Sequence, residues 1–123
     1  MLAILEHGEV VLKDGRASHV GFETHAGMLF LTNRRMIFIR DGDVIVPLGG
    51  SAHPGGIMEI QLKDIESCEP AYTTLLGIIP LVPDRIDITC YKADRFSFNL
   101  NDREEWLAAI VKAAHDEANP TSN

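Results

Sequence analysis

The chain has 123 residues, of which 46% are hydrophobic and 24% charged, a composition typical of a globular protein with one core. Its 18 acidic residues outnumber its 11 lysines and arginines, so the formal net charge is -7 and nucleic acid is not an expected partner. No apolar run approaches the roughly 18 residues of a membrane-spanning helix, and the first residues lack the pattern of a signal peptide. We therefore expect a cytoplasmic protein.

The first 26 residues predict one short strand and an irregular connection. Residues 8–13 favour a strand, and the Asp14–Gly15 pair that follows is a turn signal. Residues 16–26 are mixed in polarity, so we expect them to cross irregularly to the centre of the fold.

The predicted centre of the fold is a hairpin. Two apolar runs, residues 28–31 and 36–39, flank a polar turn, and neither run alternates with polar residues. This pattern favours strands covered on both sides, or strands that cross between two packed sheets, over a surface ribbon. Arg34 and Arg35 in the turn, with Arg16 before it, are candidate anion contacts because guanidinium groups pair well with phosphate. The alternative is that these arginines form surface ion pairs with the abundant carboxylates.

The second half of the chain predicts further strands. After a short apolar run at 44–46, residues 47–56 contain four glycines and two prolines and predict a loop. Residues 57–62 alternate in the period of a half-buried strand, and another strand begins near Ser67. The clearest hairpin is formed by residues 85–91 and 95–100, with these side chains directed inward: Ile86, Ile88, Cys90, Phe96, Phe98 and Leu100.

Residues 101–118 predict a C-terminal helix. Asn101 and Glu104 have the spacing of a capping box, and Pro120 ends the pattern, so we expect 119–123 to be a frayed tail. The apolar stripe that should face the core contains Trp106, Leu107, Ile110, Val111 and Ala114. About seven strands followed by one helix predict a mainly β, antiparallel domain whose helix covers an open end or edge.

This order of elements resembles the GRAM and bacterial PH-like domains of the pleckstrin-homology superfold. The resemblance rests on residues 8–12, 27–38, 60–65 and 95–98, followed by the helix with Trp106. It implies a single domain over 1–123, built as a barrel of two near-orthogonal antiparallel sheets that the helix caps. Members of this family bind phosphoinositides, other lipids or proteins, and they are not usually enzymes.

The most unusual stretch is residues 70–83, which carry no charge. Fully burying a large apolar side chain contributes about 1.5–3 kcal/mol, so we do not expect all of this stretch to stay exposed. Three explanations remain open: packing into the domain's own core, a protein interface such as a homodimer, and shallow insertion into a membrane. The candidate interaction residues are Leu75, Leu76, Ile78, Ile79, Leu81 and Val82.

The sequence contains no catalytic or metal-binding motif. Cys68 and Cys90 lie in predicted strands and are expected to be reduced, and the histidines lack the spacing of a zinc site. We therefore predict a non-enzymatic interaction module, without metal or cofactor, that binds a protein partner or itself through the apolar stretch. The alternative is a lipid- or phosphoinositide-binding domain at the inner face of a membrane. That alternative requires the following side chains to gather beside the apolar stretch: Arg16, Arg34, Arg35 and Arg85.

Overall fold

The computed structural model describes residues 5–21, 24–41, 57–75 and 79–118, with the side chains of 72–75 and 79–83 left outside the description. The predicted run at 44–46, the loop at 47–56 and the tail at 119–123 lie outside the described residues. In the described part, the elements are β1 (Val11–Val20), β2 (Thr24–Thr32), β3 (Arg35–Arg40), β4 (Ile57–Gln61), the 3-10 helix η2 (Leu62–Asp64), β5 (Ile65–Leu75), β6 (Ile79–Cys90), β7 (Arg95–Leu100) and α1 (Arg103–Ala118).

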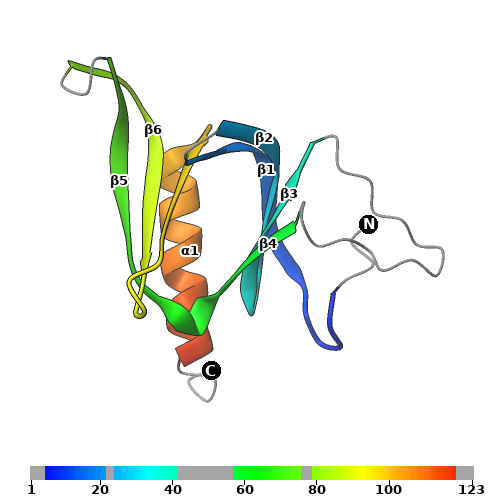
Figure 1. The fold of residues 1–123 in the computed structure, drawn as a ribbon. Coiled ribbons are helices and arrows are strands. Elements are labelled where there is room, and N and C mark those ends of the chain that lie inside the picture. The colour runs from blue at the N-terminus through cyan, green and yellow to red at the C-terminus, as the bar shows by residue number, and fades with distance from the viewer. Residues whose placement is uncertain (1–4, 22–23, 42–56, 76–78, 119–123) are drawn as a thin grey trace.

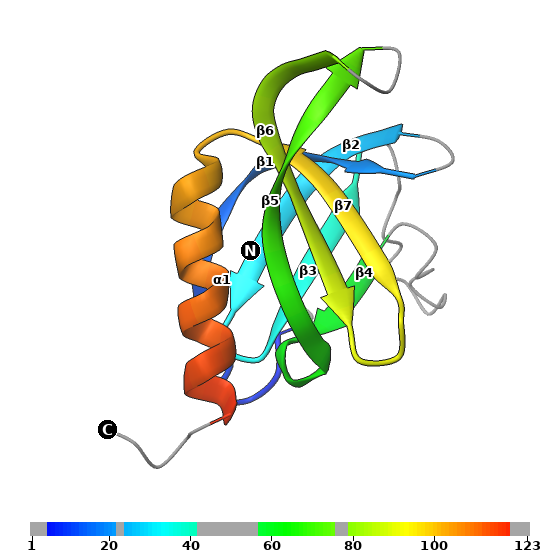
Figure 2. The same cartoon turned by 90° about the vertical axis from the view of Figure 1, so that its left-hand side faces the viewer.

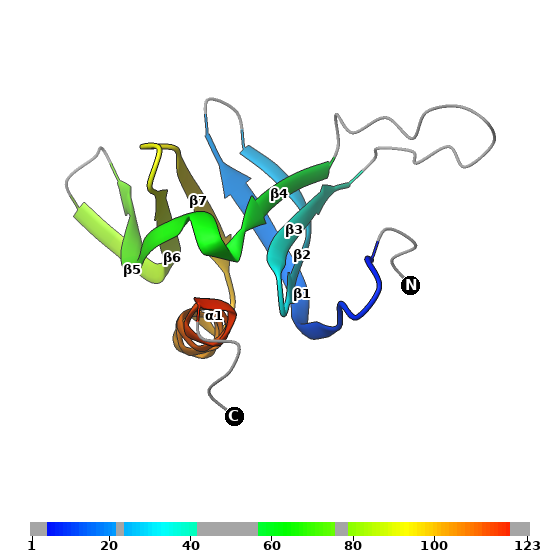
Figure 3. The same cartoon turned by 90° about the horizontal axis from the view of Figure 1, so that it is seen from below.

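The described strands form one antiparallel sheet of seven strands in the order β4-β3-β2-β1-β7-β6-β5. The sheet bends into two halves, β1 to β4 and β5 to β7, and α1 lies across the opening between them (Figure 1, Figure 3). The mainly β fold class with one C-terminal helix is therefore confirmed. No helix in the described part is long and apolar enough to cross a membrane.

The central hairpin is formed by β2 and β3, with Phe30 paired to Ile37. Met36, Ile37 and Phe38 are consecutive and at most 3% exposed, so both faces of β3 are covered, as predicted. On β2 the burial alternates, because Leu29 is fully buried whereas Met28 is only half-buried. The prediction of a doubly covered strand is therefore confirmed for β3 and wrong for β2.

The beginning of the chain differs from the prediction. β1 continues through Asp14 and Gly15 without a turn and pairs with β2 as far as Val20. The predicted turn and the predicted irregular crossing are both wrong, because pairing with β2 overrides the local turn signal. Gly15 lies against the indole of Trp106, where an added Cβ would be 3.6 Å from the ring.

Gly27 lies where β2 and β3 approach each other closely. A Cβ at this position would lie 2.2 Å from the carbonyl oxygen of Ile39 on the neighbouring strand. Because no side-chain carbon fits at that distance, glycine allows β2 and β3 to pair here in register.

The β6–β7 hairpin confirms its predicted pattern. Ile86, Ile88 and Phe98 are fully buried, and the hairpin adds its inner face to the core. Cys90 is buried, Cys68 is half-buried, and both thiols are free.

The C-terminal helix begins later than expected. The first helical hydrogen bond runs from Trp106 N to Asp102 O (3.0 Å), so Asp102, not Asn101, precedes α1. The predicted capping box is wrong, because the Glu104 carboxylate instead contacts Arg103 at 3.0 Å.

The buried stripe of α1 is also narrower than predicted. It consists of Trp106, Ile110 and Ala113, with Leu107 packed at its side. Val111 is 57% exposed, so its predicted burial is wrong. One residue turns about 100° around a helix, and that turn carries Val111 away from the face of Ile110.

Candidate functional site

A buried ion pair joins the N-terminal segment to the central hairpin. The Arg35 guanidinium donates from Nε and Nη2 to the two carboxylate oxygens of Glu9, each at 2.9 Å. The Thr32 hydroxyl donates to the same carboxylate at 2.6 Å. The hydrogen bonds from Arg35 are the main reason that the pKa of Glu9 falls to about 2, well below its usual value of 4.5. Arg35 also donates to Glu59 on β4 (2.7 Å), so one guanidinium joins three segments of the chain.

The other predicted anion contacts also have acidic partners. Arg34 Nη1 lies 3.2 Å from Glu6 Oε1, and Arg16 Nη1 donates to Asp41 Oδ1 at 2.9 Å. The hydrogen bond from Arg16 lowers the pKa of Asp41. Both pairs are exposed to solvent, so we assign them little stability. Arg85 likewise lies 3.2 Å from Asp87.

The structure does not gather these arginines at one place. Arg34 lies at the β2–β3 turn and lines a groove with residues of the last turns of α1. Arg85 lies on β6, where its backbone is opposite Ala71 on β5. Ala71 is held by Arg103 at the first turn of α1. At 1.5 Å per residue, the first and last turns of this helix are about 20 Å apart. The cluster that the lipid-binding alternative requires is therefore not formed by these side chains.

The described parts of the apolar stretch lie in the outer ends of β5 and β6. β7 pairs with β6 only as far as Arg85, but β5 and β6 continue to pair with each other up to Leu75 and Ile79. This two-stranded part extends beyond the N-terminal end of α1 (Figure 1, Figure 2). Of the candidate interaction residues, four lie in these strands and two lie outside the described residues: Leu75, Ile79, Leu81 and Val82 in the strands, Leu76 and Ile78 outside.

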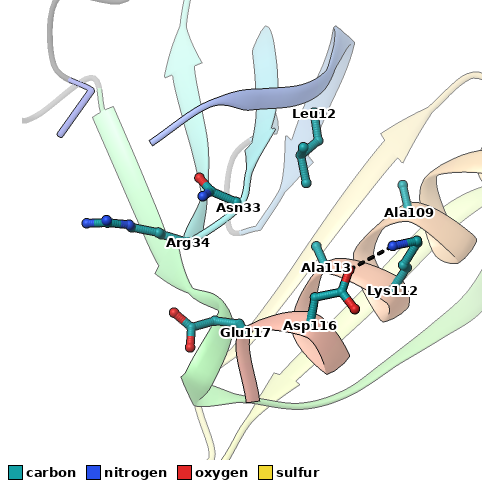
Figure 4. Close-up of a pocket in the computed structure, with 8 residues that line it drawn as sticks. All are labelled: Leu12, Asn33, Arg34, Ala109, Lys112, Ala113, Asp116 and Glu117. Atoms are coloured by element: carbon teal, nitrogen blue, oxygen red, sulfur yellow. Dashed lines mark hydrogen bonds and ion pairs between the residues drawn. The ribbon is translucent and has the colours of Figure 1, made fainter. Parts of the chain in front are cut away.

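A groove lies between the start of β1 and the C-terminal half of α1 (Figure 4). Its volume is about 760 Å³. The pairing of β1 with β2 shifts between Val11 and Lys13, so Leu12 has no partner on β2 and is 52% exposed. The lining residues are Leu12, Asn33, Arg34, Ala109, Lys112, Ala113, Asp116 and Glu117.

The sequence does not predict this groove. Its walls come from β1, from the β2–β3 turn and from α1, which are distant in the sequence and meet only in the folded chain. The single local signal is the placement of Ala109 and Ala113 one helical turn apart beside the charged residues Lys112 and Asp116. That pattern is equally typical of a solvent-facing helix.

Neither cysteine thiol is an activated nucleophile. Burial, with the charges of Asp87 and Glu69, raises the pKa of the Cys68 thiol to about 12, so this group is protonated at neutral pH. Burial likewise raises the pKa of Cys90. Within the described ranges, no three His, Cys, Asp or Glu side chains are placed to hold a metal ion.

His19 is half-buried among aromatic rings. Its ring centroid lies 5.4 Å from that of Phe98 and 6.2 Å from that of Phe38, and His25 pairs with it across β1 and β2. Burial is the main reason that the pKa of His19 falls below its ordinary value of 6.5, and the charge of His25 adds to the effect.

We expect the pKa of His19 to make the domain less stable in mild acid. Because the unfolded chain takes up the proton first, the free energy of unfolding should fall as the pH drops below about 6.5. Urea unfolding between about pH 7.5 and about pH 5.5 measures this slope. His19→Phe keeps a ring but cannot titrate, so its slope should be shallower. An identical slope in the variant would assign the effect to other groups.

The sheet, its bend and the helix across its opening together define a PH-like fold. No protein-family model matches the chain, and no curated protein matches it in sequence. Among solved structures, the Vps36 N-terminal PH domain has 16% identity and a TM-score of 0.66, covering 92% of this chain and 84% of that one. The C-terminal domain of an unknown protein from Leishmania infantum has 14% identity and a TM-score of 0.66, covering 88% and 86%. The Slm1 PH domain, in complex with phosphoserine, has 12% identity and a TM-score of 0.54, covering 84% and 91%. The predicted GRAM subtype stays a prediction.

Proposed function

We propose that the chain is a non-catalytic interaction module that docks onto a protein surface through the outer part of the β5–β6 hairpin, residues 72–83. The observation that carries the proposal is the pairing: past Ala71 and Arg85, no third strand of the described sheet continues beside these residues. An uncharged two-stranded ribbon that is rich in leucine and isoleucine is only marginally stable in water by itself, and contact with a partner would stabilise it. The PH-like fold agrees with a binding module, but a fold by itself does not identify the partner or the docking surface.

The charge pattern favours a protein partner over an anionic membrane. The arginines that lipid binding requires have carboxylate partners, and Arg34 at the β2–β3 turn lies far from Arg85 at the base of the hairpin. Exposed Glu69 and the side chain of Asp84 flank the uncharged stretch, and the net charge of the chain is -7. Acidic side chains beside a docking element oppose its approach to anionic lipid headgroups.

Site-specific cross-linking tests the proposal. A photoreactive amino acid at position 81 places the label in the hairpin, and the same label at the exposed position 111 on α1 is the matched control. We expect protein adducts in living cells from position 81 and few from position 111. Yields at position 81 no higher than at position 111 would contradict docking through the hairpin. Adducts with lipid alone would contradict docking onto a protein and would favour the lipid-binding alternative. Flotation with phosphatidylcholine vesicles, with and without phosphatidylserine, would then measure membrane binding directly.

A further inference from the structure

We propose that the groove between β1 and α1 is a second docking surface, which takes up an extended segment of another protein that carries both apolar and basic side chains. The groove lies at the C-terminal half of α1, whereas the outer β5–β6 hairpin starts at its first turn, so the two surfaces are separate. Three features of the groove carry the inference: an exposed apolar run, a free strand edge and a carboxylate at the end of the helix.

Three consecutive apolar side chains are exposed where β1 begins. Val10 is 53%, Val11 38% and Leu12 52% exposed. No other run of consecutive large apolar residues is this exposed in the part of the chain whose side chains the structure describes. Leu12 extends from β1 into the groove, across from Ala109 on α1 (Figure 4). Such a run beside a groove is typical of a protein-contact surface, because a guest that covers it removes apolar area from water.

The same part of β1 has a free edge. β7 pairs with β1 only over Ala17–Val20, so no strand of the described sheet lies beside the first part of β1 on that side. The Val10 N–H donates to Asn33 Oδ1, and the Val10 carbonyl accepts from the Asn33 N–H, so both groups point toward the β2–β3 turn. Neighbouring residues of a strand direct these groups to opposite edges, so those of Val11 point to the free edge. An extended guest can therefore pair with Val11 as an added strand.

The charges of the groove favour a basic guest. Lys112 and Arg34 already have carboxylate partners, Asp116 at 2.7 Å and Glu6 at 3.2 Å. Glu117 also lines the groove and is half-buried, and no lysine or arginine in the described part of the chain pairs with it. It lies in the last turn of α1, where free carbonyl groups add negative potential, so a guest lysine or arginine would compensate both. The net charge of -7 attracts a basic segment and disfavours a second copy of this chain.

Binding of synthetic peptides to the full chain, followed by fluorescence anisotropy, tests the proposal. The probe is a labelled peptide of alternating valine and lysine. Its controls are a peptide of alternating valine and glutamate, which reverses the charge, and one of alternating serine and lysine, which removes the apolar side chains. We expect a dissociation constant on the order of 10–100 µM for the probe and at least about 10-fold weaker binding of each control peptide. Added salt should weaken the binding of the probe.

Two variants and two matched controls assign the binding to the groove. Leu12→Ser should weaken the binding of the probe about 5- to 10-fold, and Glu117→Gln about 3-fold. Val111→Ser removes a similarly exposed apolar side chain elsewhere on α1, and Glu104→Gln removes one carboxylate at the other end of the helix, where it is 78% exposed. Both controls should bind like the wild type. Circular dichroism of each variant verifies that it is folded.

Hydrogen exchange tests the free edge itself. The bound probe should slow the exchange of the Val11 amide hydrogen, because that group then donates to the backbone of the peptide. A probe that is N-methylated throughout keeps its side chains but cannot donate a backbone hydrogen bond, so it should bind at least about 10-fold more weakly.

Three results in these binding experiments would overturn the proposal: no binding of the probe up to about millimolar concentration, a Leu12→Ser variant that binds like the wild type, or an N-methylated probe that binds as well as the unmodified one. Self-association of the wild type that Leu12→Ser abolishes, measured by sedimentation velocity, would assign the groove to a second copy and would also overturn it. None of these results bears on the outer hairpin, because cross-linking at position 81 tests that surface separately.

Discussion

Replacing Glu9 by alanine is expected to lower the free energy of unfolding by about 3–5 kcal/mol, because it leaves the buried charge of Arg35 without its main partner. The Glu9 side chain is fully buried, and that of Arg35 is 7% exposed, so water cannot replace the carboxylate at both nitrogens. Urea unfolding, followed by the fluorescence of Trp106, measures the loss. A loss below about 1 kcal/mol would show that the pair is accessible to water in solution.

Two further variants separate the buried pair from its surroundings. Glu59→Ala removes the half-exposed partner of Arg35 and should cost less than about 1 kcal/mol. Glu9→Ala/Arg35→Met removes both buried charges, so the double variant should be more stable than Glu9→Ala alone.

The pH dependence of the wild type provides an independent check on Glu9. Its pKa is about 2 in the folded chain and 4.5 ordinarily, so the ionised form is favoured by folding. The stabilisation is present above the higher value and is lost as the pH falls from about 4.5 toward about 2. Glu9→Ala should lack this part of the acid transition.

Replacing Trp106 by alanine is expected to lower the free energy of unfolding by about 3–5 kcal/mol, enough to unfold a marginal domain. The indole is 3% exposed, it packs against Gly15 of β1, and Lys13 Nζ lies 5.2 Å from its ring centroid. It therefore fixes α1 against β1. Far-UV circular dichroism during urea unfolding measures the loss without using the missing fluorophore.

Val111→Ala on the same helix is the matched control for Trp106→Ala. Val111 is 57% exposed, so its truncation should change the free energy of unfolding by no more than about 0.5 kcal/mol. If the two variants lost similar stability, burial of the indole would not explain the result for Trp106→Ala, and helix propensity could not explain it either, because alanine is the best helix former.

Local periodicity was sufficient to predict most of the sheet. β6 and β7 alternate over their whole paired length, and the two runs of the central hairpin bracket a turn that the structure places at the same residues. At Asp14 and Gly15, in contrast, the local signal failed, because pairing with β2 and contact with Trp106 depend on residues far along the chain. The free energy gained by pairing β1 with β2 therefore outweighs the local preference of Asp14 and Gly15 for a turn.

The candidate sites differ in how far the sequence alone predicts them. The apolar stretch at 70–83 was recognisable because it lacks charge, a property that needs no structure. The ion pair of Glu9 with Arg35 joins residues 26 positions apart, and the groove requires the docking of α1 beside β1. Neither has a local signature, so only the fold reveals them.

The pairing of β1 with β7 has a consequence for how the domain folds. Ala17 lies opposite Leu100, so segments from near the two ends of the described chain meet in the middle of the sheet. Contacts between such distant segments carry a large loop-closure cost and slow the folding reaction. During synthesis, the first half of the sheet must wait for β7 and α1 to leave the ribosome, and until then Leu29 and Leu31 lack much of their final cover.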